Sequence, residues 1–182
     1  MCALSAGVAG MMSRPAPAAT KCVDFDDLPN NGSYQAPFVS QGVNINVLQV
    51  NNTIGNSCAG QMLFGAATVR PAANACGGNG SAPNELIIDQ VLLDFNMTDF
   101  FNGNPVKKLS FKYAIVSPNV EIVINGQCFV RPSFTALPNG VYAGVKYKAT
   151  ACKVTLKQKT SAIKGFAVGG DVMYLDDVCA KN

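Results

Sequence analysis

The sequence predicts an all-β protein, built as an antiparallel two-sheet β-sandwich. Apolar residues recur with a period of two, which is typical of strands with one buried and one wet face, and no segment has a convincing helical period. Clusters of Gly, Pro, Asn and Ser separate these segments and predict turns. We expect about ten short strands with turns between them, and such a pattern suits two packed sheets.

The predicted strands follow this alternation in order along the chain. In the segment 21–28, Val23 and Phe25 alternate with aspartates, and later segments alternate apolar residues with lysine, serine and threonine. Segment 70–84 is rich in Gly, Pro and Asn and is predicted to be a loop. The other strands are expected at 43–50, 61–69, 86–95, 109–115, 121–124, 127–130, 145–149, 153–159, 162–168 and 172–178.

The dipeptide Asn125-Gly126 gives the clearest local prediction. It separates the apolar runs 121–124 and 127–130 by two residues. Both residues tolerate the positive φ of a type I′ turn, so a tight β-hairpin is predicted here.

The composition indicates a single domain behind a short leader. Of 182 residues, 48% are hydrophobic and 14% are charged, which argues for a compact fold and against disorder. Residues 1–20 contain small apolar residues and close on Ala16-Pro17-Ala18, a small-x-small pattern that predicts a signal peptide or, alternatively, a retained N-terminal arm. Residues 21–182 are then one β-sandwich domain, and no run is apolar enough for a membrane span.

The cysteines predict disulfides and a secreted, extracellular protein. Cys2 lies in the leader, and the remaining six are even in number and dispersed, without the close pairs or the histidines that a zinc site needs. All six are expected to be oxidised. They are Cys22, Cys58, Cys76, Cys128, Cys152 and Cys179.

Four sequons predict that the chain is a glycoprotein if it passes through a eukaryotic secretory pathway. In a chain rich in Asn, Ser and Thr some sequons also arise by chance. The acceptor asparagines are Asn31, Asn51, Asn79 and Asn96.

The absence of histidine argues against an enzyme. It excludes nucleophiles that depend on a Ser-His or Cys-His pair. A glycosidase needs two carboxylates facing one sugar, and no pair of the eleven acidic residues stands out in the sequence. A net charge of +3 is too small to imply a nucleic-acid partner.

The two ends of the domain resemble those of galactose-binding-like jelly rolls, a group that includes carbohydrate-binding modules and the MAM adhesion domain. The segments that carry the resemblance are CVDFDDLP at 22–29 and GDVMYLDDVC at 170–179. The resemblance implies a jelly-roll sandwich whose first and last strands are adjacent. It also implies a structural calcium ion between them, held by Asp24 or Asp26 and Asp176 or Asp177, with carbonyls and waters as further ligands. Adjacent end strands would make Cys22–Cys179 the preferred disulfide among the fifteen pairings that six cysteines allow.

Candidate ligand-binding residues are aromatic or basic. Tyr34 and Tyr142 lie beside predicted turns and are the best candidates for exposed rings, while most other rings are expected in the core. Lys146 and Lys148 belong to a lysine-rich strip that also contains Lys153, Lys157 and Lys159. This strip could attract acidic polysaccharide or an anionic surface, although a solvated sheet face is the commoner explanation.

These observations favour a non-catalytic extracellular binding module with glycan as its ligand. The alternatives are a structural subunit of a matrix, cell-wall or filament-like assembly, joined by strand addition, and a polysaccharide-acting enzyme. The expected partners are a glycan or an extracellular matrix or surface protein, with possible self-assembly. Neither nucleic acid nor a membrane span is expected.

Overall fold

The structure is a computed structural model that describes residues 18–49 and 65–182. Most of the predicted leader, Cys58 and Asn51 lie outside the described residues. The described residues form an all-β protein, as predicted. Its strands are β1 (Thr20–Val23), β2 (Ser33–Tyr34), β3 (Phe38–Ser40), β4 (Val43–Gln49), β5 (Ala66–Pro71), β6 (Asn84–Phe95), β7 (Lys108–Ile124), β8 (Gln127–Arg131), β9 (Gly140–Tyr142), β10 (Val145–Ala149), β11 (Lys153–Gln158) and β12 (Phe166–Lys181). The short helices are η1 (Ala75–Gly77), α1 (Met97–Phe100) and η2 (Phe134–Ala136).

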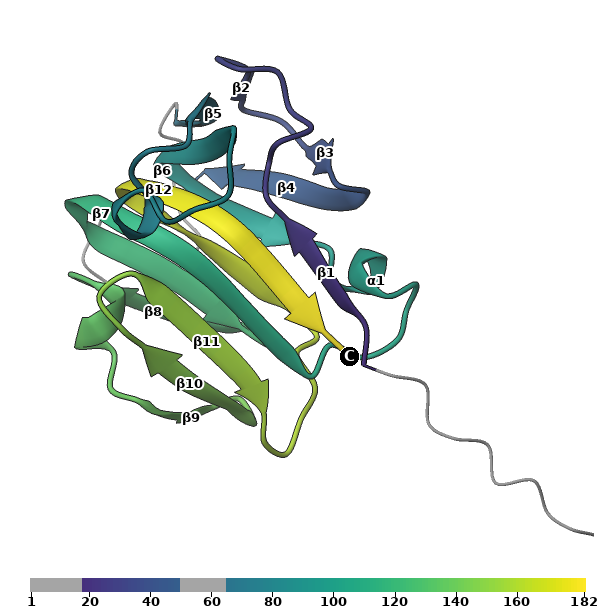
Figure 1. Ribbon diagram of the computed structural model, residues 1–182. Coiled ribbons are helices and arrows are strands. Elements are labelled where there is room, and N and C mark those ends of the chain that lie inside the picture. The colour runs from purple at the N-terminus through teal and green to yellow at the C-terminus, as the bar shows by residue number, and fades with distance from the viewer. Residues whose placement is uncertain (1–17, 50–64) are drawn as a thin grey trace, which may run out of the picture.

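The strands are linked by hydrogen bonds into one large antiparallel sheet. Its main path has the order β2-β5-β6-β12-β7-β11-β10-β9, and β1, β3, β4 and β8 pair beside this path. Figure 1 shows β12 and β7 crossing the middle of the molecule, with β4 and β6 on one side and β8 to β11 on the other. The antiparallel all-β class is confirmed, and the division into two packed sheets of jelly-roll type stays a prediction.

Two strands are longer than the sequence predicts. The segments 109–115 and 121–124 belong to one strand, β7. The strand predicted at 162–168 begins only at Phe166, and it continues through the segment 172–178 as one strand, β12. Shifts in the register between β7 and β12 mark bulges, which let a strand continue past residues that break the alternation.

β1 is shorter than predicted, because the strand expected at 21–28 ends at Val23. Phe25 has a positive φ of 65°, which turns the chain, yet its ring is fully buried. The alternation of Val23 and Phe25 therefore identifies two core residues correctly and the strand boundary wrongly.

One contiguous core carries most of the buried apolar side chains. The ring of Phe111 lies 5.4 Å from that of Phe134 and 5.6 Å from that of Phe166. The Tyr147 hydroxyl, also in the core, donates a 2.6 Å hydrogen bond to the carbonyl of Phe134, so this buried polar atom has a partner.

The predicted hairpin and the preferred disulfide are both confirmed. Ile124 pairs with Gln127 across Asn125 and Gly126, whose φ angles are 49° and 81°. Cys22 is bonded to Cys179 at the point where β1 pairs with β12. A second disulfide joins Cys76 to Cys152, and Cys128 is also in the disulfide-bonded state.

Candidate anion-binding face

The outer face of the sheet carries a concentration of lysines on β7, β10, β11 and β12. On β10 and β11 the side chains of Val145, Tyr147, Val154 and Leu156 are buried, so the alternate residues point to solvent. Seven of the chain's eleven lysines share this face, which we call the lysine face. It consists of Lys108, Lys112, Lys146, Lys148, Lys153, Lys157 and Lys181.

Four of these lysines form a line across four neighbouring strands. Lys146 on β10 lies opposite Lys157 on β11, which lies opposite Lys108 on β7. Lys108 in turn lies opposite Lys181 on β12. Neighbouring strands are about 4.8 Å apart, so this lysine row extends roughly 14 Å across the sheet.

The lysine row is electrostatically uncompensated. Like charges directly opposite each other on neighbouring strands are destabilising. Among the described residues, none of the four row lysines forms an ion pair, and the ion pair found on this face joins Lys112 to Asp177 at 2.7 Å. The row is exposed along its whole length. The net charge of the chain is only +3, yet positive charge is concentrated locally on this face.

Hydroxyl groups lie beside the lysine row. One step along the strands, Lys148 lies opposite Thr155, and Thr155 lies opposite Ser110. Hydroxyls both donate and accept hydrogen bonds. The face therefore offers cationic and hydrogen-bonding groups side by side on neighbouring strands.

Sequence reasoning found half of the lysine row. Lys146 and Lys157 lie in the lysine-rich strip recognised in the sequence. Lys108 and Lys181 were missed, because they precede and follow that strip by many residues and join it only through the pairing of β11 with β7 and of β7 with β12. No local pattern in the sequence carries this information.

The structure does not bring Tyr34 and Tyr142 together. Their strands, β2 and β9, lie at opposite ends of the main path of the sheet. The ring of Tyr34 stacks on Phe38 at 4.4 Å, and both tyrosines are partly buried against the core. The hydroxyl of Tyr142 donates to the carbonyl of Pro138 at 2.8 Å.

Some of the acidic side chains at the two ends of the domain lie close together. Burial raises the pKa of Asp26, with a contribution from the nearby charges of Asp24 and Asp177, while a hydrogen bond from the Asn84 N–H opposes it. These three carboxylates therefore lie near one another, as predicted. Asp24 accepts from the side chain of Gln41, and Asp177 pairs with Lys112, so both already have partners.

Asp176 lies opposite Lys112 in the ladder and is fully buried. Its Oδ1 atom accepts hydrogen bonds from the Ser81 hydroxyl at 3.1 Å and from the Asp177 N–H at 2.6 Å, and its Oδ2 atom has no partner. Within the described residues no group of three or more acidic, cysteine or histidine side chains is arranged to hold a metal ion. The calcium site at the acidic ends stays a prediction.

The sequon asparagines that can be described are exposed. Asn31 accepts a hydrogen bond from Arg70, and Asn96 caps α1 through the Thr98 N–H. The Asn79 side chain donates to the carbonyl of Cys76. Exposure is compatible with glycosylation, which stays a prediction.

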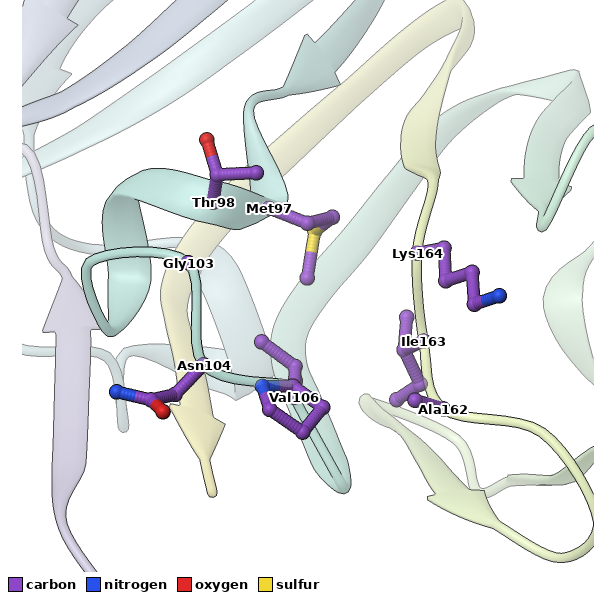
Figure 2. A pocket seen from close by; sticks show the side chains of 9 residues that line it. Met97, Thr98, Gly103, Asn104, Val106, Ala162, Ile163 and Lys164 are labelled. Carbon is purple, nitrogen blue, oxygen red and sulfur yellow. The ribbon is translucent and has the colours of Figure 1, made fainter.

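A separate pocket of about 210 Å³ lies between α1 and the segment before β12. Figure 2 shows Met97 pointing from α1 into the space near Val106 and Ile163, while the side chain of Lys164 points away from Met97. The walls are mainly apolar and carry no carboxylate. This pocket lacks the convergent polar groups that a specific small-molecule site uses.

The chain matches no protein-family model, no curated protein and no solved structure. In the part of the chain that the structure describes, no helix has the length and apolarity needed to cross a bilayer.

Proposed function

We propose that this chain is a non-catalytic extracellular binding module, a β-sandwich of jelly-roll type, whose ligand is an acidic glycan. The observation that carries the proposal is the lysine row. Four exposed lysines oppose one another across four strands without acidic partners. An extended polyanion laid across the strands relieves this repulsion and places a negative charge near each lysine.

Several features favour a glycan over other polyanions. The disulfides suit an oxidising, extracellular environment, where acidic polysaccharides occur. The hydroxyls of Ser110 and Thr155 are suited to hydrogen bonding with sugars. The lysine row lacks the stacked aromatic rings on which proteins usually bind single-stranded nucleic acid.

The proposal is tested by measuring binding to a polyuronate, a sulfated glycan, a neutral glucan and a single-stranded DNA. We expect binding to the acidic glycans that falls steeply with salt, because the screening length shrinks to about 3 Å at 1 M. The double variant Lys108→Gln/Lys157→Gln should bind about tenfold more weakly, since it removes the two central charges of the row.

The matched control is Lys107→Gln/Lys164→Gln, which removes the same net charge from exposed lysines outside the row. It should change the affinity by less than about twofold. Equal losses in the two double variants would mean that net charge alone attracts the ligand. Equal binding of the neutral glucan, or tighter binding of the DNA, would contradict the glycan proposal.

Assembly by strand addition is the second candidate function, and one observation favours it. Among the described strands β3 pairs with β4 alone, and Val39 on β3 is 52% exposed. An unpaired strand edge with an exposed apolar side chain can accept a further strand. A concentration-dependent mass in sedimentation that Val39→Lys abolishes would favour assembly over glycan binding.

A further inference from the structure

A bulge brings an aspartate and an asparagine together where β7 crosses the middle of β12. Val120 pairs with Gly170 and Ser117 pairs with Val172, so Pro118 and Asn119 together oppose Asp171. Two residues against one define a β-bulge, which leaves a residue without a ladder hydrogen bond. Proline has no N–H to donate and is therefore tolerated at such a position. Asn119 has a positive φ of 72°, and its side-chain amide donates a 3.0 Å hydrogen bond to Oδ2 of Asp171.

Glu121 lies beside this bulge, two residues from Asn119 on the same face of β7. Its neighbour across the ladder is Gly169, which has no side chain to separate Glu121 from Asp171. Glu121 is 1% exposed, and its Oε2 atom has no hydrogen-bond partner. The Oδ1 atom of Asp171 is also buried and without a partner.

Two adjacent carboxylates with unpartnered oxygens are costly in a protein interior. A buried charge needs a partner, and two like charges at close range repel each other. The proximity also appears in the pKa of Glu121, which burial and then the charge of Asp171 raise to about 7. The guanidinium of Arg131, on the neighbouring strand β8, donates to the carbonyl of Val130 and forms no ion pair with either carboxylate.

We propose that Glu121 and Asp171 are ligands of a calcium ion, with Asn119 as a positioning residue. Oε2 of Glu121 and Oδ1 of Asp171 are hard oxygen ligands of the kind that Ca²⁺ prefers, and backbone carbonyls and waters complete its six to eight ligands. The hydrogen bond from Asn119 occupies Oδ2 of Asp171 and leaves Oδ1 for the ion. With two carboxylates, the site belongs to the weak class typical of extracellular modules, with a Kd of about 10⁻⁴ to 10⁻³ M.

This site is distinct from the calcium site predicted at the acidic ends. Glu121 lies near the C-terminal end of β7 and Asp171 in the first half of β12, whereas Asp24, Asp26 and Asp177 lie where β1 meets the end of β12. An ion at the bulge binds the folded state alone and therefore stabilises the pairing of β7 with β12. The inference does not depend on the proposed glycan ligand.

The test is thermal unfolding of the full chain after treatment with a chelator, followed by titration with Ca²⁺ or Mg²⁺ alone. We expect 10 mM Ca²⁺ to raise the melting temperature by about 3–6 °C if the Kd is near 1 mM. Mg²⁺ should have a smaller effect, because it demands a tighter octahedral geometry. Calorimetric titration should show that the double variant Glu121→Gln/Asp171→Asn binds one Ca²⁺ per chain fewer than the wild type.

The glutamine and asparagine variants keep the shape of the side chains and remove the charges, so they should fold without calcium. Near-UV circular dichroism checks this, and the single variants Glu121→Gln and Asp171→Asn provide a second measurement. The control Asp176→Asn/Asp177→Asn should keep the part of the Ca²⁺ response that Glu121→Gln/Asp171→Asn loses. The proposal is overturned by a wild type indifferent to Ca²⁺, or by a response of the same size in Glu121→Gln/Asp171→Asn and in the wild type.

Discussion

Glu85 and Asp176 are both fully buried carboxylates, and their surroundings differ in kind. Glu85 accepts hydrogen bonds from the N–H groups of Ala73, Asn74 and Ala75, which stabilise a negative charge. Asp176 keeps one oxygen without a partner. Burial, together with the charge of Asp177, raises its pKa to about 7.

The raised pKa of Asp176 predicts that stability decreases as the pH rises from about 4 to about 7. The folded state holds the proton more tightly than the unfolded state in this window, so proton release on unfolding is favoured at higher pH. The unfolding free energy should fall by at most about 1.4 kcal/mol per pH unit, since unfolding releases no more than one proton from this carboxyl group. Urea unfolding at several pH values in the presence of a chelator measures this dependence.

Asp176→Asn should be more stable than the wild type at pH 8 and less sensitive to pH. Some dependence should remain, because the pKa of Glu121 is raised in the same direction. The exposed Asp89→Asn on β6 is the control and should keep the wild-type profile. A wild type whose stability rises between pH 5 and pH 7 would contradict the assignment.

For the acidic residues at the two ends of the domain, the sequence predicts which side chains approach each other but not which of them are buried. Asp24, Asp26 and Asp177 gather as the terminal motifs imply. Asp176 lies opposite Lys112 on the outer face of the sheet, and it is buried there because Gly80 and Ser81 pack against it. The register of β12 shifts only after it, between Asp176 and Cys179, where Asp177 has a positive φ of 50°. A bulge of this kind reverses the alternation of faces along the strand. A prediction from a strict period of two cannot include this reversal.

Among the elements, the hairpin between β7 and β8 follows most directly from its residues. Asn125 also connects this turn to the rest of the fold, because its side chain accepts from the N–H groups of Lys164 and Gly165 and donates to the carbonyls of Ala143 and Ala162. The turn residue therefore has a tertiary role that the dipeptide signature does not reveal.

Gly126→Val should destabilise the protein by about 1–2 kcal/mol. Gly126 has a φ of 81° and open space around its Cβ position, so the cost comes from backbone strain and not from a clash. Gly126→Asn is the matched control, since asparagine tolerates this conformation and should lose less stability. Equal melting temperatures for Gly126→Val and the wild type would refute the turn assignment.

The long strands are the elements that the sequence predicts least well. Pro118 and Asn119 read as a break between two strands, and in the structure they form a bulge within β7. Gly169 and Gly170 likewise lie inside β12. Breaks and bulges use the same residue types, so only the pairing partner on the other strand distinguishes them.

At the scale of the whole molecule, the separation of charge depends on strand order. β7 pairs with β11 on one side and with β12 on the other, although β8, β9 and β10 intervene in the sequence between β7 and β11. This order aligns Lys157, Lys108 and Lys181. The alternation within each strand predicts that these lysines are exposed, while their alignment into one row requires the complete topology.

The disulfide Cys22–Cys179 joins the first strand of the described chain to the last. β1 has four register pairs with β12, and the disulfide closes a separation of 157 residues. The bridge Cys76–Cys152 already shortens that loop in the unfolded chain, which reduces the entropy that the outer disulfide removes. Cys22→Ala/Cys179→Ala should therefore lower the unfolding free energy by roughly 2–5 kcal/mol.

The same variant should loosen β1 before the rest of the sheet. Without the disulfide a four-residue edge strand is held by few interactions, so its amides should exchange faster than those of β7, which is paired on both sides. Cys76→Ala/Cys152→Ala is the control, because it should lower the global stability while β1 stays protected. Hydrogen exchange measured by mass spectrometry distinguishes the two variants. If β1 is equally protected in both, its pairing with β12 holds the chain end without help from the disulfide.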